Sequence, residues 1–378
     1  MSPDDRIKRA EERAREDALK PVMGAKSGQK RTRHVAIGDP QAPLSKFLAI
    51  LEHQRLLGED GRLAPEVMLV SMGDHFDYGK EELRERATAD GTALLSWLAW
   101  HSADQVVIIL GNHDLCRLGE LYGLDDATYR TARAEADLAY RRGNVDEEAE
   151  KKFIAKWPRF PSAEIASRDF SCFEAKQGPL VEQVVRSGRG RLAYEYGGTL
   201  MVHAGVTNDD LATTGFQGGG AKEAAESIQR YFHRAVSQWR SGPLSLEPLH
   251  RAGDAARGEG RGTLYQRPAD PELGQAELFE GPPRRRFHPQ RLPRNFTQAI
   301  GHIRDNKCRK LMPHWSDPAE KDADGPLRSL LVDDAGIRYR RGVHKGAAMV
   351  FLDGGMQHVA PDRYELLDLD ALAPAKPQ

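Results

Sequence analysis

Three short apolar runs in the first third of the chain each end on glycine followed by polar residues. They are HVAIGD (34–39), VMLVSMGD (67–74) and QVVIILGNHD (105–114). Runs of this kind are typical of strands that are buried on both faces of a sheet. The segments between them, 45–57 and 80–102, have helical spacing. Strands alternating with helices predict a parallel sheet with right-handed crossovers.

The rest of the chain predicts an insertion, a hairpin and further strands. Residues 120–190 are polar, with a helix-like part at 126–157, and we expect an insertion over the sheet edge or the site. RLAYEYGGTLMVHAG (191–205) predicts a β-hairpin. Residues 222–240 predict a helix, and 242–294, rich in Gly, Pro and Arg, predict loop. Four strand-like runs predict a second sheet packed on the first: 296–303, 327–333, 347–353 and 363–369.

These segments suggest a simple organisation. We expect a charged N-terminal leader over residues 1–33, to which we assign no chemistry. One large domain then covers residues 34–378, with insertions at about 120–190 and 242–294.

Composition narrows the class of protein and its partners. Of 378 residues, 39% are hydrophobic and 29% charged, which is ordinary for a soluble protein. A net charge of −1 gives no field that would favour long nucleic acid or a membrane as partner. Three cysteines without a CxxC pair predict a reduced protein. The charged N-terminus lacks the apolar core of a signal peptide, so we expect a cytoplasmic location.

Polar side chains collect where the predicted strands end. Ligands of parallel sheets bind beyond the carboxyl ends of the strands, so we expect these side chains to converge. The candidates are Asp39, Gln41, Asp74, Asp77, Asn112, His113, Asp114, His203 and His302. Carboxylate, amide oxygen and imidazole together suit Mn²⁺, Fe or Zn²⁺. A pair of divalent cations would offset the repulsion between the carboxylates, and it can clamp a phosphate group.

Taken singly, most of these motifs have plainer explanations. A GD pair after a strand is usually a turn or a helix cap. A lone histidine such as His203 or His302 is more often structural than a ligand. Five such motifs in order, each at a strand end, favour a functional site.

The ordered motifs GD-x-Q, GDHFDYG, GNHD, VHAG and GH, between residues 38 and 302, resemble the calcineurin-like metallophosphoesterase superfamily. The resemblance implies a four-layer α/β/β/α sandwich of two mixed β-sheets flanked by helices, here with a largely helical insertion. It also implies two divalent metal ions, with Mn²⁺ favoured and Fe or Zn²⁺ as alternatives.

The resemblance also implies roles for the strand-end residues. Six of them would be metal ligands: Asp39, Gln41, Asp74, Asn112, His203 and His302. Asp74 would bridge the two ions, with Asp39 and Gln41 on one ion and the remaining three residues on the other. His113 would be a general acid or charge stabiliser, aided by Asp77 or Asp114.

The sequence departs from the family pattern at several positions. Gln41 stands where histidine is usual, and Arg304 replaces the last histidine of GH-x-H. RGTLYQRP (261–268) is similar to a stretch of the phosphoprotein phosphatases, in which Arg267 would bind substrate phosphate. A second phosphate-binding arginine is missing because Tyr78 occupies its place, and Arg304 or Arg117 would replace it.

The chain is closest in pattern to the bacterial phosphoprotein phosphatase-like members. The implied reaction is hydrolysis of phosphate monoesters, on a phosphorylated protein or a small phosphoester, by in-line attack of a metal-bound hydroxide. One alternative is a dinucleoside polyphosphate hydrolase or nucleotide phosphodiesterase. Another is a weakly active scaffold that uses the fold to bind a partner, which Gln41 and Tyr78 would favour. The oligomeric state does not follow from the sequence.

Overall fold

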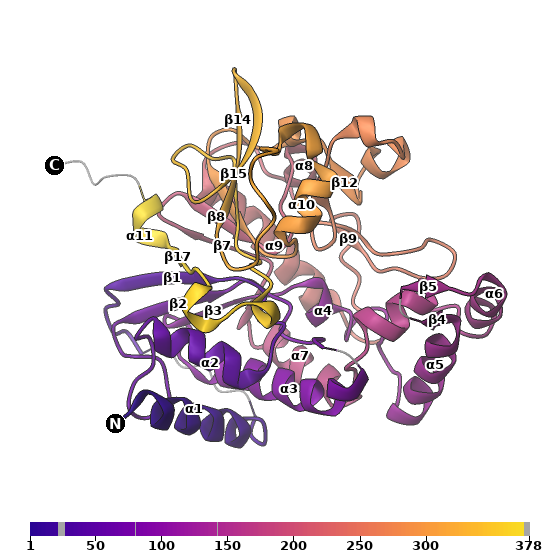
Figure 1. The fold of residues 1–378 in the computed structure, drawn as a ribbon, viewed down its shortest axis with the longest axis horizontal. Coiled ribbons are helices and arrows are strands. Elements are labelled where there is room, and N and C mark those ends of the chain that lie inside the picture. The colour runs from indigo at the N-terminus through magenta and orange to yellow at the C-terminus, as the bar shows by residue number, and fades with distance from the viewer. Residues whose placement is uncertain (22–26, 80, 142, 374–378) are drawn as a thin grey trace.

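Two mixed β-sheets lie face to face at the centre of the molecule (Figure 1). The computed structural model describes residues 1–21, 27–79, 81–141 and 143–373. Helices pack on the outer face of each sheet, so the expected four-layer α/β/β/α sandwich is confirmed.

The first sheet has five strands in the order β17-β1-β2-β3-β6. Strands β1, β2, β3 and β6 are parallel to their neighbours, as the apolar runs predict, and β17 is antiparallel to β1. The strands are β1 (Arg33–Ile37), β2 (Val67–Ser71), β3 (Val106–Ile109), β6 (Gly190–Arg191) and β17 (Leu367–Asp368).

The second sheet has six strands in the order β15-β14-β16-β13-β8-β7. The central strands β16, β13 and β8 are parallel, and the outer pairings are antiparallel. The predicted hairpin is confirmed as β7 and β8, which turn at Gly197 and Gly198. The strands are β7 (Ala193–Tyr196), β8 (Thr199–Val202), β13 (Thr297–Ile300), β14 (Arg328–Asp333), β15 (Gly336–Arg341) and β16 (Met349–Phe351).

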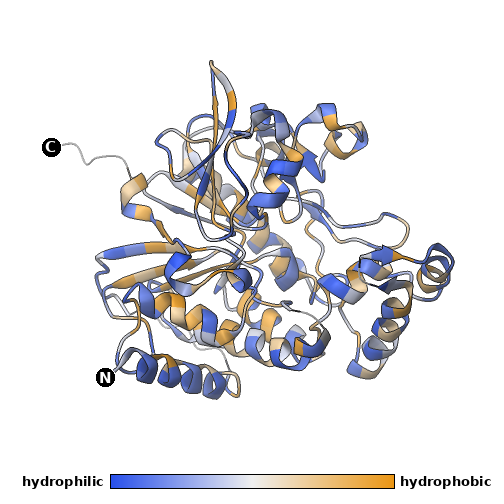
Figure 2. Ribbon diagram, viewed as in Figure 1, coloured by the Kyte–Doolittle hydropathy of each residue, from blue (hydrophilic) through white to orange (hydrophobic). Residues whose placement is uncertain are grey.

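Both faces of the first sheet are buried, which explains its continuous apolar runs. Val35 and Ile37 of β1 belong to the core beneath the helices. Ala36, between them, belongs to a separate core between the sheets, together with Met201 and Val350 of the second sheet. Successive side chains of a strand point to opposite faces, so each run supplies both cores. Apolar colour accordingly follows the central strands in Figure 2.

Helices cover the two outer faces. The helices near the first sheet are α1 (Pro3–Asp17), α2 (Leu44–His53), α3 (Arg84–Trp100), α7 (Gln177–Arg186) and α11 (Leu369–Leu372). Helix α9 (Ala221–Gln238) packs on β7 and β8 of the second sheet. Three short helices occur in loops after strands: α4 (Asn112–Leu115), α8 (Asn208–Thr213) and α10 (Asp305–Leu311).

The insertion after β3 is largely helical and projects from one side of the sandwich (Figure 1). It contains α5 (Asp126–Ala139), the short strands β4 (Tyr140–Arg141) and β5 (Asn144–Val145), α6 (Glu147–Lys156) and a π-helical turn, Ile165–Asp169. A core of its own, with Tyr129, Phe153 and Phe160, holds it together.

The segment 242–294 is mostly loop, as predicted. Its regular structure is limited to short pieces: β9 (His250–Arg251), β10 (Arg261–Gly262), β11 (Arg267–Pro268), β12 (Arg286–Phe287) and the 3₁₀-helices Pro271–Leu273, Ala276–Phe279 and Pro289–Arg291. Further 3₁₀-helices lie at Glu81–Leu83, Pro313–Trp315, Met356–His358 and Pro361–Arg363.

One predicted strand belongs to the other sheet. The run 363–369 was expected in the second sheet, but only Leu367–Asp368 is extended, and it pairs with β1 of the first sheet. Strand β15 was not predicted, because its sequence GIRYRR is half charged and only partly buried. It pairs along its whole length with β14 at the edge of the second sheet.

The first helix packs on the molecule through charged contacts as well as apolar ones. Helix α1 contacts α2 and α3, and Arg15 on α1 lies 2.6 Å from a carboxylate oxygen of the buried Asp90 on α3. Asp90 also accepts hydrogen bonds from the Tyr78 hydroxyl, at 2.6 Å, and from the Leu44 backbone N–H that begins α2.

Among the described residues, no helix is both long and apolar enough to span a membrane.

Candidate metal centre and catalytic pocket

The polar strand ends of both sheets meet beside one pocket of about 380 Å³, which Asp39, Asp77 and His302 line directly. Asp39 follows β1, Asp74 and Asp77 follow β2, and Asn112 begins the helix after β3. His203 and His302 follow β8 and β13 of the second sheet. The predicted convergence of the strand ends therefore occurs, and both sheets contribute to it.

Three of the expected ligands lie within reach of one cation. Asp74, His203 and His302 each offer a ligand atom, and these atoms lie within 4.8 Å of one another. The Nε2 atom of His203 is 3.3 Å from Asp74 Oδ2 and 3.1 Å from Asn112 Oδ1. These four side chains therefore form one compact donor group.

The backbone fixes which nitrogen of each histidine faces this group. His203 Nδ1 lies 2.8 Å from the carbonyl oxygen of Met72, and His302 Nε2 lies 3.0 Å from that of Tyr265. A carbonyl oxygen only accepts, so these two nitrogens carry the hydrogen. Neutral His203 then has a lone pair on Nε2, and neutral His302 has one on Nδ1. Metal-binding histidines are oriented by such contacts to carbonyl groups.

Asp39 carries an unsatisfied buried oxygen beside a second buried acid. Its Oδ2 accepts a hydrogen bond of 2.8 Å from the His302 backbone N–H, whereas Oδ1 has no hydrogen-bond partner among the described residues. Burial and the nearby charges of Asp353 and Asp74 raise the pKa of Asp39 well above its usual range. A bound cation would satisfy Oδ1 and offset this repulsion, so the residues present fit a metal centre.

Gln41 lines the pocket, and its amide oxygen is available to bind a cation. Its Nε2 donates a hydrogen bond of 3.2 Å to the carbonyl oxygen of Phe76, which leaves the amide Oε1 as an acceptor. Gln41 does not cap the following helix, because α2 begins after Pro43 without a side-chain cap.

Asp353 was missed by the sequence reasoning. It is buried and lines the same pocket next to Asp39, to whose pKa it contributes. A signal was available, because FLDGG (351–355) has the same pattern of apolar run, aspartate and glycine as the earlier strand ends.

The backbone is strained where these loops turn. Non-glycine residues with positive φ include Asp74 (58°), Asp77 (64°) and His302 (66°). Such conformations cost energy and tend to occur at functional sites. Glycine is required at two neighbouring positions, since a Cβ on Gly301 would lie 1.9 Å from Asp39 Oδ1, and one on Gly111 would lie 2.1 Å from Asp74 Oδ1.

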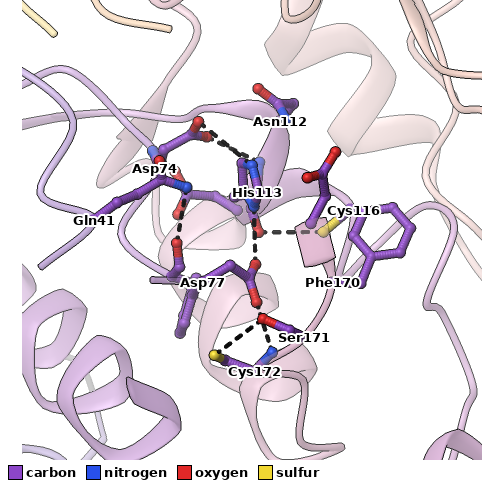
Figure 3. A network of polar contacts seen from close by, with 12 residues as sticks. Gln41, Asp74, Asp77, Asn112, His113, Cys116, Phe170, Ser171 and Cys172 are labelled. Carbon is purple, nitrogen blue, oxygen red and sulfur yellow. Dashed lines mark hydrogen bonds and ion pairs between the residues drawn. The ribbon is translucent and has the colours of Figure 1, made fainter. Parts of the chain in front are cut away.

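His113 lies between two carboxylates (Figure 3). Its Nδ1 is 3.0 Å from Asp77 Oδ2, and its Nε2 is 4.0 Å from Asp74 Oδ2. Burial opposes the charged ring, but Asp74 and Asp77 outweigh it and raise the pKa of His113 to about 9. His113 is also a lining residue of the pocket, so its protonated ring can face a bound ligand.

Arg117 lies beneath this pair rather than in the pocket. It was expected among the phosphate-binding arginines, yet its side chain is fully buried and holds both oxygens of Asp77, at 2.6 and 3.1 Å. Its Nε donates to Gln177, and Asp77 accepts a further hydrogen bond from the Cys172 backbone N–H. The end of the insertion is thereby tied to the carboxylate that orients His113.

Asp114 supports the loops instead of the reacting groups. It was expected to aid His113, but it is fully buried and accepts hydrogen bonds from the backbone N–H groups of Asp74, His75 and Gly111 at 2.8–3.0 Å. Its carboxylate also contacts His75 Nδ1 at 3.0 Å. His75 was not predicted, because it occupies a spacer position in GDHFDYG.

Two of the three expected phosphate-binding arginines line the pocket. Arg267 has only a loose contact of 3.8 Å with Glu259, and its buried Nε has no partner among the described residues. Arg304 makes a two-pronged ion pair with Asp324, at 2.7 and 3.1 Å. Besides Asp353, the charged lining residues that were not predicted are Arg168 and Asp169 from the insertion and Lys307 from α10.

Comparison with known proteins agrees with this geometry at the family level. Residues 32–218 match the family model for calcineurin-like phosphoesterases, and this part of the chain is a calcineurin-like phosphoesterase domain. The match includes Asp39, Asp74, Asn112 and His203 but ends before His302. The expected superfamily is therefore confirmed over these residues, and it supports a metal-dependent phosphoesterase.

Similarity to individual proteins is weak. One solved structure with similarity is a protein serine/threonine phosphatase from Saccharomyces cerevisiae, described as similar to human phosphatase PP5. Sequence identity is 11%, the alignment covers 91% of each chain, and the TM-score of 0.33 is too low to carry an argument. A search of curated proteins gives no match.

Proposed function

We propose that the chain is a dinuclear metal-dependent phosphomonoesterase of the phosphoprotein phosphatase type. The observation that carries the proposal is the unpaired Asp39 Oδ1, which faces a pocket also lined by His113, Arg267 and His302, the last of these being a member of the donor group around Asp74. A site that holds metal donors, a proton donor and an arginine has the parts that hydrolysis of a phosphoester requires.

In this proposal the two groups of donors hold one divalent cation each, with Mn²⁺ favoured. Asp39 and Gln41 would hold one ion, and Asn112, His203 and His302 the other, with Asp74 shared between them. Such a pair supplies Lewis acidity and lowers the pKa of bound water. The oxygen donors Asp39 and Gln41 favour a hard ion.

The chain's own residues would orient the phosphate and move a proton. Arg267 lines the pocket with unused N–H donors, which suit the oxygens of a phosphoryl group. His113 keeps its Nδ1 hydrogen on Asp77, so its Nε2 hydrogen would pass to the leaving-group oxygen. Arg117 would keep Asp77 charged and in place during this transfer.

Hydrolysis of paired model substrates tests the proposal. Metal-free protein is supplied with Mn²⁺, and release of p-nitrophenol is measured from p-nitrophenyl phosphate and from bis(p-nitrophenyl) phosphate. We expect Mn²⁺-dependent turnover with kcat/KM for the monoester clearly above that for the diester. A preference for the diester would indicate a phosphodiesterase instead. No turnover of either ester by fully loaded protein would indicate the binding scaffold.

A further inference from the structure

The pocket is larger than a phosphoryl group requires, and the charged residues on its remaining walls are mostly cations. A volume of about 380 Å³ lies in the range of sites that hold a whole small ligand. Apart from the metal donors, Asp353 and the His113–Asp77 pair, its charged lining consists of Arg168, Arg267, Arg304 and Lys307, with one acid, Asp169, that is paired with Arg168. A leaving group in this space would meet mainly polar and charged side chains rather than an apolar wall.

Lys307 is the cation in this set that lacks a counter-ion. Among the described residues, no carboxylate forms an ion pair with its ammonium group, whereas Arg304 is paired with Asp324. The nearby charge of Arg267 is the main cause that lowers the pKa of Lys307 to about 8, although the residue is exposed to solvent. These two neighbouring cations, one unpaired and the other loosely paired, repel each other, and an anion placed between them would relieve that repulsion.

The cations extend from the metal donors toward the insertion. Arg267 is close enough to His302 to lower the pKa of that histidine, and Lys307 is influenced by both Arg267 and Arg168. Arg168 uses Nε and Nη1 on Asp169 and Glu164, at 2.8 and 2.7 Å, and more than half of its side chain is exposed. It sits on a π-helical turn, a distortion that is frequent at functional sites.

We propose that Lys307, assisted by Arg168, binds a second anionic group on the leaving-group side of the substrate. The preferred substrate is then a phosphoester whose leaving group carries its own carboxylate or phosphate. This inference rests on the proposed phosphomonoesterase function and specifies its substrate class. Arg267 contacts the phosphate that is cleaved, and Lys307 contacts the group beyond it.

Three related esters test the inference. Phenyl phosphate has a neutral leaving group, 4-carboxyphenyl phosphate adds a carboxylate, and 1,4-phenylene bisphosphate adds a phosphate. KM is measured for each with Mn²⁺-loaded wild type, Lys307→Met, Lys307→Arg and Lys310→Met. Each ester is compared with itself across variants, so differences in leaving-group reactivity cancel. Lys310, exposed on the same helix and outside the pocket lining, is the matched control.

We expect Lys307→Met to raise KM for one or both of the charged esters by about five- to tenfold, the range of a single charge-assisted contact. The change for phenyl phosphate should be much smaller. Lys307→Arg should restore most of the effect, and Lys310→Met should show none. The ester with the larger change identifies whether a carboxylate or a phosphate is preferred.

Two results would overturn the inference. One is an equal change in KM for all three esters, and the other is no change for any of them. Absence of turnover would count against the proposed function alone. Calorimetric binding of the same esters to the loaded protein would then give the same comparison between variants, so the second-anion site can be judged separately.

Discussion

The two halves of the candidate metal centre differ in how far the protein has arranged them in advance. In the imidazole half (Asp74, Asn112, His203, His302), donor atoms already contact one another, and backbone carbonyls fix both rings. In the oxygen half (Asp39, Gln41, Asp353), two buried acids lie together and one oxygen has no partner among the described residues.

This difference indicates two kinds of metal site. The imidazole half is preorganised by hydrogen bonds that need no cation, so it should bind its ion more tightly. The oxygen half has a repulsion that only a cation or a proton relieves, so it should bind a harder ion and release it first. The following predictions test this contrast, beginning with the largest expected effect.

Asp74 lies in the imidazole half, but in the proposed arrangement it also binds the ion of the oxygen half, so its loss should abolish the contrast. Asp74→Asn removes the charge that both ions would share, and we expect loss of both ions and a fall in activity of about 10³-fold or more. Metal content by mass spectrometry and turnover of p-nitrophenyl phosphate measure the two effects. A variant that keeps two ions and activity within tenfold of wild type would rule out the shared position.

His113 belongs to neither half of the metal centre. Its substitution should therefore lower the rate of hydrolysis without changing metal binding. His113→Ala is expected to lower kcat by about 10²–10⁴-fold, the usual contribution of a general acid. Two ions per chain should remain bound, as measured on the same sample. If the substitution empties either half, His113 belongs to the metal centre and the division into two halves is incomplete.

Substitution of Asp353 should have opposite effects on stability in the metal-free and the metal-loaded protein. Asp353→Asn removes one of the buried acids that face Asp39, so the metal-free protein should melt about 2 °C higher. In the Mn²⁺-loaded protein the change should reverse, because the weaker ion is held less tightly and stabilises less. Thermal unfolding with EDTA and with excess Mn²⁺ tests this sign change, and destabilisation under both conditions would contradict it.

Substitution of Gln41 should change which metal the oxygen half prefers, and of the four substitutions it should have the smallest effect on activity. Gln41→His supplies an imidazole in place of an amide oxygen, so this half should bind Zn²⁺ more tightly and resist mild chelation. Wild type should lose one ion first and recover better with Mn²⁺ than with Zn²⁺. Equilibrium dialysis of both proteins measures this, and identical metal preferences would mean that Gln41 Oε1 does not face an ion.

The sequence predicted the strand ends well because their chemistry is local. An apolar run that stops at glycine and aspartate places Asp39 and Asp74 at the edge of a buried sheet, and this needs no knowledge of distant contacts. The same rule, applied to the end of β16, would have found Asp353.

The misassigned residues depend on contacts between distant segments. Arg117 looks available for phosphate in the sequence, yet Gln177 and the backbone of Cys172 enclose it with Asp77. Lys307 and Arg168 are 139 positions apart in the numbering, and only the folded insertion brings both to one pocket. Sequence spacing carries no information about such encounters.

The buried carboxylate of Asp90 has a practical consequence for anyone who shortens this protein. It joins Arg15 of the first helix to Tyr78, which lines the catalytic pocket. A recombinant chain that begins after residue 33 would leave Asp90 without Arg15 and would loosen the support behind Tyr78. Substrate profiles measured on such a trimmed protein would therefore describe an altered pocket, and the N-terminal helix should be kept in any comparison of substrates.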